Sequence, residues 1–152
     1  MNKIFEKRHS VRNFQNKEIR EKDLKEILEA ANSAPSAGNL KARRIVVVKN
    51  LDLKQKLTEA ALNQGFINEA PAVLVFFALP SVSAEKYGSR GKNLYAIQDA
   101  TIAASFAWLQ AVILGIDSCW VGAFDEEKVK EILNAKQEEQ PIAILPLGYQ
   151  LV

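Results

Sequence analysis

The sequence has little of the residues that most often build disulfides, metal sites and hydrolytic sites. Among its 152 residues it has one cysteine, Cys119, and one histidine, His9. A single cysteine excludes an intrachain disulfide, and a reducing compartment is the simplest interpretation. A zinc site needs ligands that this chain lacks, and no serine–acid signature surrounds the one histidine. We therefore expect no metal and no catalytic triad.

An excess of charge and a long hydrophobic run are also missing. Twenty basic and eighteen acidic residues leave a net charge of +2, whereas a dedicated nucleic-acid surface usually carries a strong basic excess. The longest apolar stretch, residues 100–114, is interrupted by polar side chains and is too short to span a bilayer. The charged first ten residues predict no signal peptide. The sequence thus predicts a soluble cytoplasmic protein without nucleic-acid or membrane partners, while a local anion site stays open.

The apolar residues that are present predict one domain with alternating helices and strands. They make up 48% of the chain, enough for the core of a single domain. Apolar spacing, caps and turn residues predict helices over residues 2–8, 21–33, 51–61, 93–114 and 126–134. Runs of apolar and β-branched residues predict strands over residues 44–49, 72–78, 116–122 and 141–148. The run AVLVFFA at 72–78 does not alternate, so both of its faces should be covered. Residues 79–92 are expected to be polar and irregular.

The helix predicted over residues 93–114 is unusual because Asp99 is its only charge. A helix that is apolar nearly all round should be buried nearly all round. One small protomer can hardly wrap it completely, so the pattern favours a partner chain. No G-x-G-x-x-G follows an early strand, which argues against a Rossmann fold.

Three segments carry residues suited to ligand binding. Residues 8–12 (RHSVR) place two guanidiniums and a hydroxyl at a helix end, and arginine binds phosphate oxygens in pairs. The alternative is a solvated helix end. Residues 34–40 (APSAGNL) are small enough to let a flat ligand approach the backbone, or they form an ordinary loop. Residues 115–125 run through a glycine turn into an acid-capped helix. Backbone amides at Gly122 and Ala123 would face a ligand there, or the turn only connects a strand to a helix.

Taken together, these segments resemble the nitroreductase family. RHSVRNF is similar to its N-terminal flavin-phosphate motif, and APSAGNLKARRIVVV is similar to its second motif. FINEAPAVLVFF, NLYAIQDATIAAS, GIDSCWVGAFDEEKVKEIL and PIAILPLGY match later family segments in the right order. The resemblance covers nearly the whole chain, so it is more specific than any one motif.

The resemblance implies an α+β fold with a central mixed β-sheet, flanking helices and a long buried central helix. It implies an obligate homodimer with FMN at the interface, built from one FMN-binding domain over residues 1–152. Two departures are visible. The family often has Gln, Pro and Trp where this chain has Lys41, Ala42 and Arg43, and the usual C-terminal tail with its basic residues is lacking.

The resemblance also implies which residues hold the cofactor. Arg8, Ser10 and Arg12 would hold the phosphate and ribityl chain, and the main chain of His9 would lie along the cofactor. Residues of the partner subunit would cover the flavin ring: Pro35, Ser36 and Asn39. Residues of the subunit that holds the phosphate would line the ring: Val121, Gly122 and Ala123. Asn68 would contact the ring edge or the ribityl chain.

Other polar residues near these motifs have alternative roles. Lys41, Arg43 or Arg44 would at most assist Arg12 with the phosphate. Asp99 is expected to be a satisfied core or interface carboxylate, with a flavin-site or partner contact as the alternative.

The activity implied is transfer of a hydride from NADH or NADPH, through FMN, to a nitroaromatic, quinone or similar small acceptor by a ping-pong mechanism. The cofactor carries such chemistry, so no catalytic side chain is assigned. Two alternatives stay open. One is another flavin reaction on the same fold, such as dehalogenation, flavin reduction or desaturation, with residues 79–92 as the substrate lid that decides it. The other is a non-catalytic flavin-binding protein.

Overall fold

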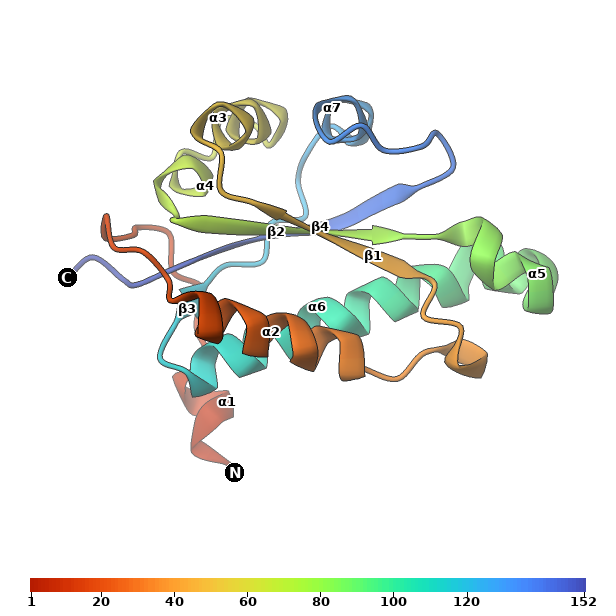
Figure 1. Ribbon diagram of the computed structural model, residues 1–152, viewed down its shortest axis with the longest axis horizontal. Coiled ribbons are helices and arrows are strands. Elements are labelled where there is room, and N and C mark those ends of the chain that lie inside the picture. The colour runs from red at the N-terminus through yellow and green to blue at the C-terminus, as the bar shows by residue number, and fades with distance from the viewer.

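The computed structural model describes all residues from 1 to 152 and is built on a four-stranded sheet with helices on both faces (Figure 1). The strands lie in the order β1–β2–β4–β3. Their bounds are β1 Arg43–Val48, β2 Ala72–Ala78, β3 Asp117–Ser118 and β4 Gln140–Gly148. The helices are α1 Lys3–Lys7, α2 Glu21–Ser33, α3 Leu51–Ala60, α4 Phe66–Glu69, α5 Pro80–Arg90, α6 Ala96–Ile113 and α7 Glu126–Ile132.

All pairs of neighbouring strands are antiparallel, so the prediction of a mixed sheet is wrong in this detail. The only parallel pairing is an isolated bridge between Ser10 and Ser118. The cause lies in the connection from β1 to β2. Val48 at the end of β1 pairs with Val73 at the start of β2, so α3 and α4 leave and re-enter the sheet at the same end. A parallel pair would need a crossover to the opposite end.

β2 is buried along its whole length, as its unbroken apolar run predicts. Val73, Val75 and Phe77 join the apolar cluster beneath α3 and α7, and Leu74 and Phe76 join the cluster on the α2 and α6 side. Figure 1 shows these helices covering opposite faces of the sheet. The predicted caps are confirmed as well. Asn50 accepts a hydrogen bond from the Leu53 amide at 2.9 Å, and Asp125 accepts one from the Lys128 amide at 3.1 Å.

α6 meets the sheet and α2 through small side chains. Apart from Asp99, its buried residues are all alanines: Ala96, Ala100, Ala103, Ala104, Ala107 and Ala111. Of its larger apolar side chains, Ile102 and Trp108 are half-buried against the same core, while Phe106 is 39% and Ile113 63% exposed. Within the protomer, α6 is therefore buried on one side and not all round as expected.

Residues 79–92 are more regular than predicted, because Pro80–Arg90 forms α5, although Gly88 interrupts this helix. Pro80 stands in the first turn, where proline is tolerated, and the polar residues that suggested a loop lie largely on the exposed side of this helix. A turn of π-helix, Gly91–Tyr95, joins α5 to α6. The whole helical run, Pro80–Ile113, is long and apolar enough by length and composition to cross a membrane. In this fold its second half packs on the sheet and on α2 as the core helix.

The strand predicted over residues 116–122 is also shorter than expected. Only Asp117 and Ser118 form β3, at the edge of the sheet, and Val121 makes a separate bridge to Ile144. The chain leaves the sheet between these two contacts, and the residues after Val121 do not pair with a strand.

Candidate functional site

The N-terminal segment (residues 8–12) is held in an extended conformation along the edge of the sheet. The Val11 amide donates to the Ser118 carbonyl at 3.0 Å, and the Val11 side chain is buried in the same cluster as Phe14 and Val121. Val11 anchors the segment, so its neighbours Ser10 and Arg12 are left exposed. The two polar residues that the sequence singled out are thus presented to solvent from a fixed backbone.

Positive charge gathers along this segment. The guanidinium carbon of Arg8 lies 4.7 Å from the centre of the Trp108 ring, and Arg12 is exposed with no ion pair. His9 is exposed, and its Nδ1–H donates to the Lys7 carbonyl at 2.8 Å. That hydrogen bond raises the pKa of His9 above its ordinary value, helped by the Gln150 side chain and opposed by slight desolvation. Its cationic form is therefore favoured, and the segment offers several donors to an anion.

The glycine turn (residues 121–123) lies beside α4 and the residues that lead into it. Val121 exchanges backbone hydrogen bonds with Ile144, both at 3.0 Å, and the Asp125 amide donates to the Ala60 carbonyl at 2.9 Å. Gln64 donates to the Ala123 carbonyl at 3.2 Å. The turn is fixed on both sides while Gly122 and Ala123 themselves stay exposed. The amides of Gly122 and Ala123 donate to no other backbone group, so they are free to face a ligand.

Asn68 in α4 carries an unsatisfied buried atom. Its side-chain oxygen Oδ1 has no hydrogen-bond partner, and such atoms are rare in native proteins and call for an explanation. Ile67 and the neighbouring Ala70 pack in the same apolar cluster as Val11 and Val121. The structure therefore brings the N-terminal segment, Asn68 and the glycine turn to one end of the protomer.

The third predicted segment lies elsewhere. The small-residue loop (residues 34–42) follows the far end of α2, whereas the N-terminal segment lies near its start (Figure 1). The 13 residues of α2 span about 20 Å at 1.5 Å per residue. One protomer thus does not bring Pro35, Ser36 and Asn39 to Arg12. In the loop, Ser36 Oγ accepts from the Lys41 amide at 2.9 Å, and Asn39 is exposed with a φ of 55°.

Two buried charges clamp this loop from inside. Asp99, 2% exposed, accepts from the Ala37 amide at 3.0 Å and from the Ala42 amide at 3.3 Å, one on each oxygen. Arg43 donates to the carbonyls of Asn32, Ala34 and Pro35 at 3.1, 2.9 and 3.4 Å. Burial lowers the pKa of Arg43, and the charge of Asp99 opposes that change. The expectation that Asp99 is a satisfied core carboxylate is confirmed.

Neither Arg43 nor Arg44 is available to assist Arg12 with an anion. Arg43 is committed to the loop carbonyls, and Arg44 binds both oxygens of Glu139 at 2.8 and 2.9 Å. Burial alone would raise the pKa of Glu139, but hydrogen bonds from Arg44 and from the Lys136 amide lower it overall. The clamp formed by Asp99 and Arg43 was not predicted, although a lone acid in an apolar helix and an arginine after a run of small residues were signals for it.

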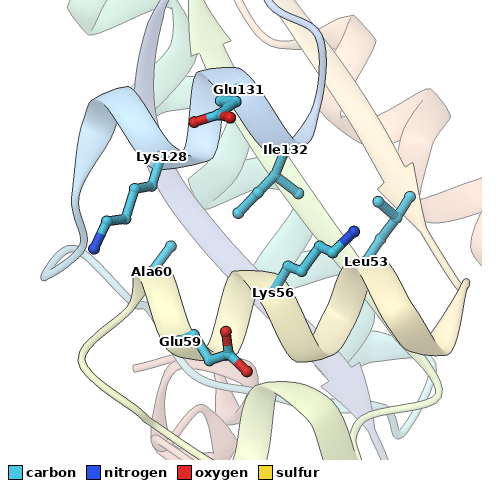
Figure 2. A pocket seen from close by; sticks show the side chains of 7 residues that line it. All are labelled: Leu53, Lys56, Glu59, Ala60, Lys128, Glu131 and Ile132. Atoms are coloured by element: carbon cyan, nitrogen blue, oxygen red, sulfur yellow. The ribbon is translucent and has the colours of Figure 1, made fainter.

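The hollows in the surface of the protomer mostly lie away from these residues. A groove of about 470 Å³ runs between α3 and α7, and Figure 2 shows the side chains that line it. A larger one of about 810 Å³ lies between α5 and the chain that leads into β4. Neither is lined by a predicted site residue. A third hollow, which Ile116 and Asp117 also line, has His9 as its one predicted site residue. The candidate residues of one protomer form an open surface.

Comparisons with known proteins identify what the chain is similar to. The model of the nitroreductase family matches residues 5–149. An NADH dehydrogenase of Thermus thermophilus is 32% identical over 94% of this chain and 83% of its own length. A putative NADH dehydrogenase/NAD(P)H nitroreductase of Archaeoglobus fulgidus is 30% identical over 97% of this chain and 83% of its own.

Solved structures agree with this similarity. An FMN-dependent nitroreductase of Clostridium difficile matches with a TM-score of 0.86 and 28% identity, covering 99% of this chain and 87% of that one. A nitroreductase family protein of Clostridium novyi matches with a TM-score of 0.89 and 27% identity, covering 98% and 84%. The predicted nitroreductase-like α+β fold is confirmed.

The clamp predicts the behaviour of an isosteric variant. Asp99→Asn keeps the shape of the side chain but replaces one acceptor oxygen with an NH2 group, so one loop amide loses its partner. We expect the free energy of unfolding to fall by about 1–3 kcal/mol, the cost of an unsatisfied buried group. Hydrogen exchange at the amide of Ala37 or Ala42 should also accelerate more than exchange in β2.

Asp52→Asn is the matched control, because Asp52 makes only an exposed ion pair with Lys56, and such pairs contribute little. Unchanged exchange at both loop amides in Asp99→Asn would show that Asp99 does not hold the loop.

Proposed function

The chain belongs to the nitroreductase family, and we propose that it binds FMN and transfers a hydride from NADH or NADPH to a small acceptor such as a nitroaromatic or a quinone. One observation carries the proposal. The cationic N-terminal segment, the unpaired oxygen of Asn68 and the exposed glycine turn lie at the same end of the protomer. An anion site beside a flat, polar-edged site suits a flavin mononucleotide.

The residues present fit the two ends of FMN. Arg8, Ser10 and Arg12 would bind the phosphate and ribityl chain, with the main chain of His9 alongside. Val121, Gly122 and Ala123 would line the ring. The ring or ribityl chain would supply the donor that Asn68 Oδ1 lacks within the protomer. The phosphate carries about two negative charges near neutral pH, and cations with no carboxylate partner are suited to neutralise it.

When bound, FMN would supply the chemistry of the reaction, which is to accept a hydride from the nicotinamide and pass it to the acceptor. Backbone amides at Gly122 and Ala123 would favour negative charge on the ring, because they are fixed dipoles held by the neighbouring contacts of Val121 and Asp125. No side chain need act as an acid, since solvent reaches an open cleft. Donor and acceptor would use the same slot in turn, a ping-pong cycle that needs no separate nucleotide-binding fold.

The proposal includes a homodimer of single-domain protomers, each formed by residues 1–152. The outward side of α6 carries large apolar residues such as Phe106 and Ile113, and obligate homodimers bury surfaces of this kind. A partner would also bring its small-residue loop to an FMN site that one protomer leaves open. Pro35, Ser36 and Asn39 would then cover the flavin ring held by the other chain. We place this enzyme in the cytoplasm.

The absorption spectrum tests the proposed function. We expect the purified protein, loaded with FMN if necessary, to show a flavin absorption band that NADH or NADPH bleaches without oxygen. A nitroaromatic or a quinone should then restore the colour. Protein that binds FMN but is not bleached by either nucleotide would instead be a non-catalytic flavin-binding protein, and protein that cannot be loaded with FMN would contradict the proposal altogether.

Arg12 tests the phosphate site. Arg12→Ala should weaken FMN binding about tenfold or more, because charge-assisted hydrogen bonds are among the strongest that a side chain makes. Riboflavin, which has no phosphate, should bind almost as before, and fluorescence quenching measures both ligands. Lys25→Ala on α2 controls for net charge. Equal losses for FMN and riboflavin would mean that Arg12 supports the fold or the ring.

Mixed dimers test the sharing of each site between subunits. When one chain carries Asn39→Ala and the other Arg12→Ala, both defects should fall on one FMN site and leave the second intact. When a single chain carries both changes beside a wild-type partner, each site should carry one defect. Titration with FMN distinguishes one intact site per dimer from none. The opposite pattern would place the loop and Arg12 of the same chain in one site, and a monomer in sedimentation would rule out the dimer.

A further inference from the structure

The end of α5 and the π-helical turn after it bring together two tyrosines and two cations. The rings of Tyr87 and Tyr95 meet edge to face with their centres 5.2 Å apart. Arg90 Nε donates to the Tyr95 hydroxyl at 3.0 Å, and Lys86 Nζ lies 5.4 Å from the centre of the Tyr87 ring. The tyrosines are half-buried, and both cations are exposed. We name these four residues the tyrosine–cation cluster.

An irregular backbone makes this cluster possible. In a regular α-helix, residues eight positions apart are separated by about 12 Å along the axis, so Tyr87 and Tyr95 would not stack. Gly88 breaks the helix with φ 56° and ψ −138°, a conformation that favours glycine. Gly91–Tyr95 then forms the π-helical turn, a feature often found at functional sites.

The cluster packs directly against the small-residue loop. A Cβ atom placed on Gly38 would lie 2.5 Å from the Tyr87 hydroxyl and 3.2 Å from Lys86 Nζ, so a side chain at this position would displace the tyrosine. The loop is itself fixed from below by Asp99 through the Ala37 and Ala42 amides. The cluster and the loop thus form one continuous surface.

The two cations of the cluster have no carboxylate partner. Neither Lys86 nor Arg90 takes part in any of the ion pairs of the structure, and the acid nearest the loop, Asp99, is buried and occupied by amides. Each cation lies instead over a tyrosine ring. An aromatic wall rimmed by unneutralised positive charge suits a planar ligand that carries an anionic group.

Resting on the proposed function, which sets this loop over the flavin of the partner, we infer that the tyrosine–cation cluster selects aromatic acceptors bearing a carboxylate. The tyrosine edges would pack on the aromatic ring, and Lys86 and Arg90 would bind the carboxylate. For a nitrobenzoate, one hydride and one solvent proton reduce the nitro group to nitroso, with one N–O bond broken and water released. The carboxylate only orients the ring in this step.

A pair of acceptors that differ in charge but hardly in shape tests the inference. Protein bleached with NADH is mixed with 4-nitrobenzoate or with neutral 4-nitrobenzamide, and the return of colour is followed by stopped flow. In Lys86→Gln/Arg90→Gln, the second-order rate constant should fall about tenfold or more for the benzoate, because two charge-assisted contacts are lost. It should stay within about twofold for the benzamide. Lys22→Gln/Lys25→Gln on α2 removes the same charge at a distance and should change neither rate constant.

Each other result overturns the inference in a distinct way. Equal losses for both acceptors, or no loss for either, would show that the two cations do not recognise the carboxylate. Slower bleaching by NADH with unchanged oxidation by 4-nitrobenzoate would place the anion on the nicotinamide donor instead. Wild-type protein that is not bleached at all would overturn the proposed function, and the inference with it. If wild-type protein is bleached but Lys86→Gln/Arg90→Gln keeps the wild-type preference between the two acceptors, the inference alone is overturned.

Discussion

The close approach of α6 to the sheet is the constraint on which the other features depend. Its alanines repeat at three- and four-residue spacing on one side of the helix and are fully buried against β2, β4 and α2. Small side chains permit this approach, and close packing leaves no room for larger ones. Phe106 and Ile113 of α6 are consequently exposed on its outer side, whereas Ile102 and Trp108 are half-buried against the core. The same packing that stabilises the protomer therefore creates the surface through which a second protomer is proposed to bind.

α6 also connects the parts of the candidate site. Asp99 in its first turn holds the small-residue loop, and Trp108, about two and a half turns later, lies under Arg8 of the N-terminal segment. These contacts are made at different places on one helix, so the two segments are fixed at a set separation. The buried indole nitrogen of Trp108 at this junction has no acceptor within the protomer.

Much of the fold was predictable because buried positions give a regular spacing of apolar residues in the sequence. The helix over residues 21–33 and the strand over 72–78 have the predicted bounds, since one is amphipathic and the other is covered on both faces. Residues 79–92 were mispredicted because polar side chains on the exposed side of α5 resemble those of a loop. Residues 116–122 have the composition of a strand, but only Asp117 and Ser118 form a continuous pairing with β4, and Val121 adds an isolated bridge. Strand direction leaves no mark on periodicity at all, so the antiparallel sheet could not be read from it.

The candidate site was predictable only in part, for a related reason. Arg12 and Arg43 each follow an apolar residue and precede a polar one, yet the first is exposed and the second is buried on loop carbonyls. What separates them is the position of the carbonyl groups at the end of α2, which are near in space and eight to eleven residues away in sequence. Asn68 was identified by resemblance alone, and its unpaired oxygen is visible only once α4 is folded.

The geometry also divides the proposed site by task. The groups proposed to bind the phosphate come from the edge of the sheet, while the small-residue loop and the tyrosine–cation cluster belong to the opposite end of the protomer (Figure 1). In the proposed dimer, one chain would hold the cofactor and the other would form the wall that meets the acceptor. Changes in α5 could then alter acceptor preference without touching the residues that retain FMN. The buried Asp99–Arg43 clamp makes this division workable, because it fixes the loop from within its own protomer and leaves the exposed side of the loop free to meet the partner.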